Sequence, residues 1–395
     1  MINRGHFVIL FILTSFASFN AVLFTPTMPK LAGFFAVSNG AIQTVILIYM
    51  LGYSIGQLFY GPIANRYGNK STLYAGTVLE IISSIVCVIA IKLHLFHLLL
   101  VGRFFLAIGA GAGLVIAYAM TNQAFSGKEA SKKVAYLTLS FAMAPGVSIF
   151  IGSILLDRWG IISCFYASLV YGILILMIST TLPETAKEKQ LDALKISHLI
   201  ASYKAQFTNF KLIIPGIIMG ANASYMYVFA GVAPFIAMTK FHVSTVSYGF
   251  YNILPPLGLV IGGVLSANLA HKLTIKKLMF NGLVIVIVGV CSLALTHNMS
   301  LTSVLLSLFL PVAVVYLGAS LVHPSAIMFG MNHSTNKANA SAMLNFLNLG
   351  LVTMADAFLM YSEISFLTLL LVYIFLCAIE VTLYLLVIAR TPDGH

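Results

Sequence analysis

Four ionisable residues interrupt otherwise apolar stretches of the sequence: Glu80, Arg103, Asp356 and Glu380. Charged side chains are costly in an apolar environment, so those found there commonly have a function. A carboxyl group can carry a proton, and a guanidinium group can bind a carboxylate or phosphate through two parallel hydrogen bonds. Asp356 and Glu80 are therefore candidates for proton binding, and Arg103 is a candidate for binding an anionic group. A structural ion pair is the alternative for each.

Uncharged polar residues in the same apolar stretches form a second set of candidates. Each could contact a small molecule, and each could equally form a hydrogen bond between two helices. The residues are Asn20, Asn222, Tyr225, Asn252, His323, Asn345 and Asn348.

Other kinds of chemistry have no support in the sequence. The four cysteines show no Cys-x-x-Cys or Cys/His ligand spacing, so we expect small packing residues and no metal site. There is no GxxxxGK[ST] motif for a nucleotide. No serine, cysteine or metal constellation suggests catalysis. We therefore expect neither an enzyme nor a bound cofactor.

The elements that position these residues follow from composition. The 395 residues are 60% hydrophobic and 8% charged, whereas soluble domains carry roughly 25% charged residues. Continuous apolar runs without period-2 alternation predict an all-α integral membrane protein. We expect the first run to be a retained helix rather than a cleaved signal. A spanning helix needs roughly 20 apolar residues, and twelve segments qualify: 6–26, 41–61, 71–91, 97–122, 134–155, 161–182, 212–236, 246–268, 278–296, 302–325, 340–360 and 366–389.

The basic residues predict the orientation of these segments. If the N-terminus lies in the cytoplasm, sixteen of the 21 Lys and Arg residues fall on the cytoplasmic side. This bias follows the positive-inside rule. It predicts cytoplasmic termini and a cytoplasmic 183–211 loop in a cell inner membrane. The net charge of +11 is then a topology signal, and nucleic acid is not an expected partner, because the charges are spread over short loops.

The polar stretch 183–211 divides the chain into two halves, 1–182 and 212–395, with six predicted helices each. At an offset of 202 residues, a mid-helix Asn, two helix glycines and a basic loop recur in register. The pairs are Asn20 with Asn222, Tyr49 with Tyr251, Gly56 with Gly258, Gly61 with Gly263, and Lys70 with Lys272. We therefore predict two pseudo-symmetric six-helix bundles.

The segment that follows the second predicted helix, Gly-Pro-Ile-Ala-Asn-Arg-Tyr-Gly-Asn-Lys, resembles the signature of the major facilitator transporters, G-x-L-a-D-r-x-G-r-k. Its counterparts here are Gly61, Asn65, Arg66, Gly68 and Lys70. In the family this turn latches the two halves together in the outward-facing state. The family's acidic residue is Asn65 here, which predicts a weaker latch because a carboxylate would favour a facing helix N-terminus.

Further segments resemble the same family. Residues 99–106 resemble its fourth-helix signature with the embedded Arg103, and Pro145 with Gly152 resembles its fifth-helix antiporter motif, although Ile149 replaces a second proline. The run 26–29 and the segment 49–61 resemble the Bcr/CflA drug-resistance transporters. In that subfamily an acid precedes the proline run, where this chain has Val22.

The resemblance implies a major facilitator fold, with a central cavity worked by rocking alternating access. It places Arg103 and the polar candidates on cavity helices, and Glu80 and Glu380 on peripheral helices, where a structural role is favoured. The implied activity is export of a small organic compound, with protons as the coupling ion, by a monomer in the lipid bilayer. Because Val22 replaces an acid while Arg103 is retained, we expect an anionic or zwitterionic cargo. The alternatives are nutrient uptake by the same fold, a non-transporting sensor and an intramembrane enzyme.

Overall fold

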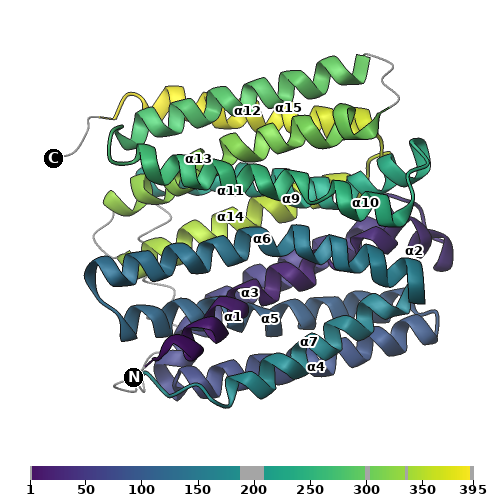
Figure 1. Ribbon diagram of the computed structural model, residues 1–395, viewed down its shortest axis with the longest axis horizontal. Coiled ribbons are helices and arrows are strands. Elements are labelled where there is room, and N and C mark those ends of the chain that lie inside the picture. Colours follow the sequence, from purple (N-terminus) through teal and green to yellow (C-terminus); the bar gives the residue numbers. More distant parts are fainter. Residues whose placement is uncertain (1, 187–208, 299–302, 334–336, 392–395) are drawn as a thin grey trace. The chain divides into compact units, whose positions relative to one another are not determined.

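The computed structural model describes residues 2–186, 209–298, 303–333 and 337–391, which are almost entirely helical (Figure 1). The chain divides into two compact units, Met1–Ile200 and Ala201–His395. This division falls inside the predicted 183–211 linker. Residues 187–208 of that linker, and with them its predicted cytoplasmic location, lie outside the described part.

The first half contains six long helical stretches. The first is α1 (Arg4–Val22), which continues through the 3₁₀ turn η1 (Thr25–Thr27) into α2 (Met28–Phe34). The others are α3 (Thr44–Tyr67), preceded by the turn η2 (Ala41–Gln43), and then α4 (Asn69–Lys92), α5 (Phe96–Ala124), α6 (Gly127–Trp159) and α7 (Ile162–Ser179).

The second half has an equivalent series with more breaks in its helices. Helix α9 (Phe210–Pro234) runs into the π-helical segment η3 (Phe235–Lys240). Then follow α10 (Thr245–Tyr251), α11 (Leu254–Leu269), α12 (Ile275–Asn298), η4 (Leu305–Phe309), α13 (Leu310–Asn332), α14 (Lys337–Met360), α15 (Phe366–Leu383) and η5 (Tyr384–Ile388).

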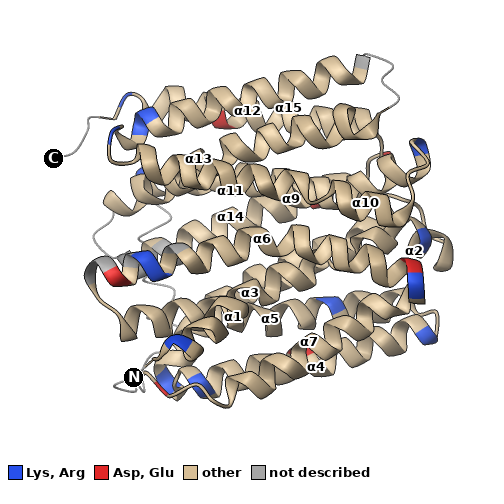
Figure 2. Ribbon diagram, in the orientation of Figure 1, with Lys and Arg blue, Asp and Glu red and all other residues tan. Residues whose placement is uncertain are grey.

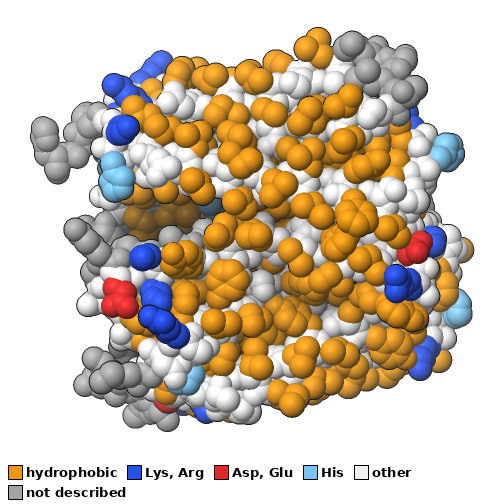
Figure 3. Space-filling model, in the orientation of Figure 1, with side chains coloured by type: hydrophobic (Ala, Val, Ile, Leu, Met, Phe, Trp, Pro, Cys, Tyr) orange, Lys and Arg blue, Asp and Glu red, His pale blue; other side chains and the backbone are white. Residues whose placement is uncertain are grey.

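Twelve helical stretches of the described chain are long and apolar enough to cross a membrane, which confirms the predicted number. Large apolar side chains such as Ile82, Val264 and Phe375 are 54%, 59% and 64% exposed. A surface of this kind needs lipid contact. Figure 2 shows most of the Lys and Arg residues at helix ends, and Figure 3 shows apolar side chains covering the middle of the visible face.

Several boundaries differ from the sequence prediction. The first span extends to Phe34 rather than 26, because the chain turns through η1 at Pro26 and resumes as a helix. The eighth span is interrupted after Tyr251, where Pro255 and Pro256 limit the backbone. Helix α6 begins at Gly127, seven residues before the predicted start. Apolar runs mark where a helix meets lipid, and they do not mark where its hydrogen bonding starts.

The two halves share one packing arrangement, which is visible at two glycines. A Cβ atom on Gly109 of α5 would lie 2.5 Å from the Gly76 carbonyl oxygen and the Glu80 nitrogen of α4. A Cβ atom on Gly318 of α13 would lie 2.6 Å from the Gly282 carbonyl oxygen and the Val286 nitrogen of α12. Only glycine allows backbones to approach this closely. The pair α4/α5 therefore corresponds to the pair α12/α13.

Candidate functional site

Arg103 is buried inside the first half, with 2% of its surface exposed. Its Nη1 donates to the Asn20 carbonyl at 3.0 Å, and its Nη2 donates to the Ala21 carbonyl at 3.1 Å. The guanidinium carbon lies 4.3 Å from the ring centre of Phe24 and 4.2 Å from that of Tyr49. Such contacts stabilise a cation when it is desolvated. The Nε atom has no hydrogen-bond partner among the described residues.

The break at the end of α1 explains why a guanidinium is needed there. The last carbonyl groups of a helix have no helical donor, and Pro26 has no N–H to offer. Arg103 bonds the carbonyls of Asn20 and Ala21, while the Thr25 hydroxyl donates to the Val22 carbonyl at 2.9 Å. These two side chains thus satisfy the carbonyls of Asn20, Ala21 and Val22 at the buried end of α1.

The same Asn20 forms a polar cluster with its side chain. Its Nδ2 donates to Glu80 Oε1 at 3.3 Å, and the Ser84 hydroxyl donates to the same oxygen at 3.0 Å. The Ser168 hydroxyl on α7 donates to Asn20 Oδ1 at 2.6 Å. Oxygen Oε2 of Glu80 has no partner in the described chain, and it occupies the space that a side chain at Gly172 would need. Glu80 therefore links α1, α4 and α7.

The second half contains a comparable cluster around Glu380 of α15. Asn222 Nδ2 donates to Glu380 Oε1 at 3.2 Å, and the Tyr225 hydroxyl donates to Oε2 at 3.3 Å. The Tyr373 hydroxyl donates to the Tyr225 carbonyl at 2.7 Å. Asn222 is the residue that the 202-residue offset pairs with Asn20. In both halves, an amide of the first helix binds a buried carboxyl group.

The sequence repeat did not reveal that these two carboxyl groups come from different helices. Glu80 lies on α4, whereas the corresponding position of α12 is Val286, by the glycine contacts described above. Six residues before Gly109 is Arg103, and six residues before Gly318 is Val312. The second half therefore replaces both charged residues by valine and supplies its acid from α15.

A double-mutant cycle on Asn222→Ala and Glu380→Ala should measure the free energy of the hydrogen bond between these two side chains. We expect a coupling free energy of about 0.6 to 1.7 kcal/mol, the range found for hydrogen bonds between membrane helices. The measurement is the unfolding equilibrium of the purified chain in mixed detergent micelles. Pairing Asn222→Ala with Glu363→Ala, an exposed acid of the same half, serves as the control. Equal coupling in the two cycles would mean that the contact contributes nothing specific.

Asp356 on α14 differs from the other two buried acids. It is 1% exposed, and neither carboxylate oxygen has a hydrogen-bond partner in the part of the chain that the structure describes. Close packing holds α14 against α9, where a Cβ atom on Gly220 would lie 2.7 Å from Leu351 Cβ. An ionised carboxylate buried without a partner costs several kcal/mol. Asp356 is thus the candidate whose charge the described residues leave unsatisfied.

The remaining polar candidates are not brought into either cluster by a described hydrogen bond. Asn252 is buried and donates to the Tyr248 carbonyl, one turn earlier in the chain. His323 on α13 and Asn345 on α14 are partly exposed. The Asn348 side-chain oxygen is buried and has no partner in the described chain.

The signature turn between α3 and α4 is held by a residue that sequence reasoning missed. Gly68 has φ +98°, a conformation that favours glycine. Glu184 accepts hydrogen bonds from the backbone N–H groups of Asn69 and Lys70, each at 3.1 Å. Lys70 Nζ donates to the Thr180 carbonyl at 2.7 Å. The carboxylate that the signature lacks at the exposed Asn65 is thus present at the α4 N-terminus, where the helix dipole favours it.

Partial burial raises the pKa of the Glu184 carboxyl, but four backbone N–H donors outweigh it and hold the pKa below its usual value. The donors belong to Asn69, Lys70, Thr185 and Ala186. A carboxyl group with a lowered pKa stabilises the fold above its unfolded-state pKa, about 4.3, and this contribution is lost as the pH falls through the folded-state value. The signal in the sequence was Pro183-Glu184-Thr185 at the start of the polar stretch.

Glu184→Ala should lower the free energy of unfolding by about 1 kcal/mol at pH 7, the usual cost of losing a helix N-cap. The difference from wild type should shrink as the pH falls below about 4. Unfolding of both proteins in detergent, at pH 7 and below about pH 4, measures this difference in free energy. Glu363→Ala should change stability by less than about 0.5 kcal/mol. A deficit that persists unchanged in acid would rule out the ionised carboxylate as the cause.

The fifth-helix motif holds α6 against the end of α1. Pro145 lies inside α6, and a Cβ atom on Gly152 would collide with the Leu23 carbonyl oxygen. The Ser148 hydroxyl donates to the Phe19 carbonyl at 2.5 Å. The motif therefore supports the same helix break at which Arg103 donates its hydrogen bonds.

Arg66 and Gly61 are two further residues of the signature turn. The guanidinium of Arg66 lies 5.3 Å from the ring centre of its neighbour Tyr67, and nothing lies within 4 Å of a Cβ atom on Gly61.

Twelve apolar spans and buried polar clusters between helices define the class of protein: a polytopic α-helical membrane protein. The sequence profile of the Major Facilitator Superfamily matches residues 10–355. The chain belongs to this superfamily.

Relatives and solved structures agree with this assignment. An uncharacterized transporter of Rickettsia felis (strain ATCC VR-1525 / URRWXCal2) is 29% identical over 66% of this chain and 64% of its own length. Multidrug resistance protein D of Escherichia coli (strain K12) is 26% identical over 52% of this chain and 51% of its own length. The chain thus spans less than two-thirds of the length of these relatives. The xylose transporter XylE from E. coli, in a partially occluded inward-open conformation, has a TM-score of 0.76 at 15% identity, over 99% of this chain and 98% of that one. At this identity the likeness shows the fold.

Proposed function

We propose that this transporter exports a small organic compound across the cell inner membrane in exchange for protons. Export is supported by the relatives named multidrug resistance proteins, among them MdtL of Escherichia coli, which is 28% identical over 38% of the chain. Proton exchange is supported by one structural observation, the buried and unbonded carboxyl group of Asp356.

The proposed coupling follows from the cost of an isolated charge. No described residue donates to either oxygen of Asp356, so its neutral, protonated form is the one that these surroundings tolerate. A conformation that exposes the carboxyl group to water, or to a cationic cargo, removes that cost. Asp356 would then release its proton on one side of the membrane and take it up on the other. Glu80 is a weaker candidate for this step, because Oε1 already accepts hydrogen bonds from Asn20 and Ser84.

The contacts of Arg103 bear on the cargo. An anionic cargo would have to displace two backbone carbonyls from the guanidinium before it could form a bidentate contact. We therefore propose a drug-like compound that needs no carboxylate. Asn20, Arg103, Asn222 and Tyr225 would position helices. Cargo contacts would come from Asn252, His323 and Asn345.

Flux in proteoliposomes tests this proposal. Purified protein is reconstituted with a panel of matched anionic, neutral and cationic compounds, and an imposed pH gradient drives transport. We expect the neutral or cationic compounds to move in the direction opposite to the protons. Movement together with protons would identify uptake instead, and a preference for anions would restore Arg103 as a cargo contact. Binding without any flux would indicate a sensor.

A further inference from the structure

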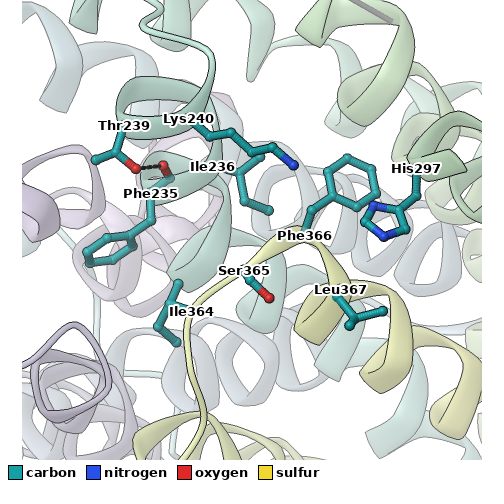
Figure 4. A pocket seen from close by; sticks show the side chains of 9 residues that line it. All are labelled: Phe235, Ile236, Thr239, Lys240, His297, Ile364, Ser365, Phe366 and Leu367. Atoms are coloured by element: carbon teal, nitrogen blue, oxygen red, sulfur yellow. Dashed lines mark hydrogen bonds between the residues drawn. The ribbon is translucent and has the colours of Figure 1, made fainter. Parts of the chain in front are cut away.

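A cavity of about 190 Å³ lies in the second half, and none of the candidate site residues lines it. Its nine lining residues come from η3, from the end of α12, and from the start of α15 with the two residues before it (Figure 4). Phe366, at the start of α15, is central to it. The Phe366 ring stacks on His297 with centroids 5.0 Å apart and planes 18° apart, and Lys240 Nζ lies 5.8 Å from the centre of the same ring.

The charge of this cavity has one sign. Its polar lining residues are Thr239, Lys240, His297 and Ser365, and no acid belongs to the nine. The Thr239 hydroxyl is already bonded to the Phe235 carbonyl, which leaves Lys240 and the His297 ring as donors toward the cavity. Ser365 caps α15 by accepting from the Thr368 N–H at 3.1 Å. The first N–H groups of this 18-residue helix, those of Phe366 and Leu367, precede its hydrogen-bonded turns and favour an anion.

The helices that line the cavity indicate its depth in the membrane. Three membrane-crossing stretches end at its walls: Phe210–Lys240, Ile275–His297 and Phe366–Ile388. In a bilayer, the ends of such spans lie near the lipid headgroups. The volume is also below the roughly 300 Å³ that is usual for drug-sized ligands. An ammonium group and N–H donors in a pocket at this level fit a phosphate group.

We propose that this cavity binds the phosphate group of a phospholipid, with Lys240 and His297 as its side-chain donors. The acyl chains of that lipid lie along the apolar surface of the neighbouring spans. The site is independent of the cargo and of Asp356, so it stands or falls separately from the proposed export activity.

The test is native mass spectrometry of the delipidated full-length chain in detergent. The protein is titrated with phosphatidylglycerol, with diacylglycerol of the same acyl chains, and with inorganic phosphate. We expect phosphatidylglycerol to bind, and Lys240→Gln to weaken its binding about fivefold, the usual contribution of one basic residue near a membrane surface. His297→Phe keeps the ring stacking and removes the N–H donors, so it should also weaken binding.

Lys272→Gln is the matched control, because this exposed lysine lies in the loop at the opposite end of α12. It should leave phosphatidylglycerol binding unchanged. Diacylglycerol binding as tightly as phosphatidylglycerol would overturn the proposal, and so would equal binding by wild type and both cavity variants. If inorganic phosphate binds as tightly as the lipid, and if Lys240→Gln weakens both equally, the proposal that the bound phosphate group belongs to a lipid is wrong. Melting temperatures of all variants confirm that each is folded.

Discussion

Asp356→Asn is expected to abolish transport driven by a pH gradient while leaving exchange of cargo intact. The amide has nearly the same shape as the carboxyl group but cannot release a proton at ordinary pH. If Asp356 carries the coupled proton, its loss disconnects cargo movement from the gradient. Gradient-driven accumulation in proteoliposomes should fall to the level of protein-free vesicles. Exchange of labelled for unlabelled cargo, which needs no net proton movement, should continue.

The stability of the same variant provides an independent check. Asp356 makes no hydrogen bond to a described residue, so Asp356→Asn removes none, and the variant should unfold at the same temperature as wild type or above it. Glu363→Gln, at an exposed acid of the same half, should retain full gradient-driven transport. Gradient-driven accumulation at the wild-type rate in Asp356→Asn would exclude this residue as the proton carrier.

Arg103→Gln is expected to lower the free energy of unfolding by about 2 to 4 kcal/mol. Each hydrogen bond from a charged donor contributes roughly 1.5 to 3 kcal/mol, and the desolvation cost of the charge offsets part of the sum. The substitution leaves the carbonyls of Asn20 and Ala21 short of donors and removes the cation between Phe24 and Tyr49. Arg103→Lys should recover only part of the loss, because an ammonium group lacks the planar fork that reaches both carbonyls.

Arg158→Gln, at an exposed arginine in the last turn of α6, is the control and should change stability by less than about 0.5 kcal/mol. Unfolding in mixed micelles and the charge preference of cargo binding are measured on the same preparations. A stable Arg103→Gln protein that has lost only anion binding would show that this residue is a cargo contact.

The sequence predicted the features that depend on composition and local pattern. Long apolar runs predicted twelve spans, and the turn 61–70 predicted the superfamily. The sequence prediction ended the first span at residue 26, and it predicted neither the earlier end of α1 at Val22 nor the return to a helix in α2. The hydrogen bonds that stabilise the end of α1 come from Arg103, which is far away in the chain.

The polar clusters show the same limit. The 202-residue offset pairs Asn20 with Asn222, and the sequence left open whether each contacts cargo or forms a hydrogen bond between helices. The structure shows both bonded to buried acids, one from α4 and one from α15. Glu380 was missed as the partner of Asn222 because the 202-residue offset places an apolar residue, Ile178, at the equivalent position of the first half. Glu184 was missed because Pro183-Glu184-Thr185 does not show which helix the carboxylate caps, more than a hundred residues away in the chain.

The most direct test of a proton-coupled transporter is to record proton and cargo movement in the same vesicles. Proteoliposomes loaded with a pH-sensitive dye receive a cargo identified in the compound panel, with no gradient imposed. We expect cargo entry to drive protons out, with the rates of the two movements proportional, and we expect Asp356→Asn to abolish the pH change while cargo exchange persists. Cargo entry without a pH change in wild type, or an equal pH change in Asp356→Asn, would contradict it.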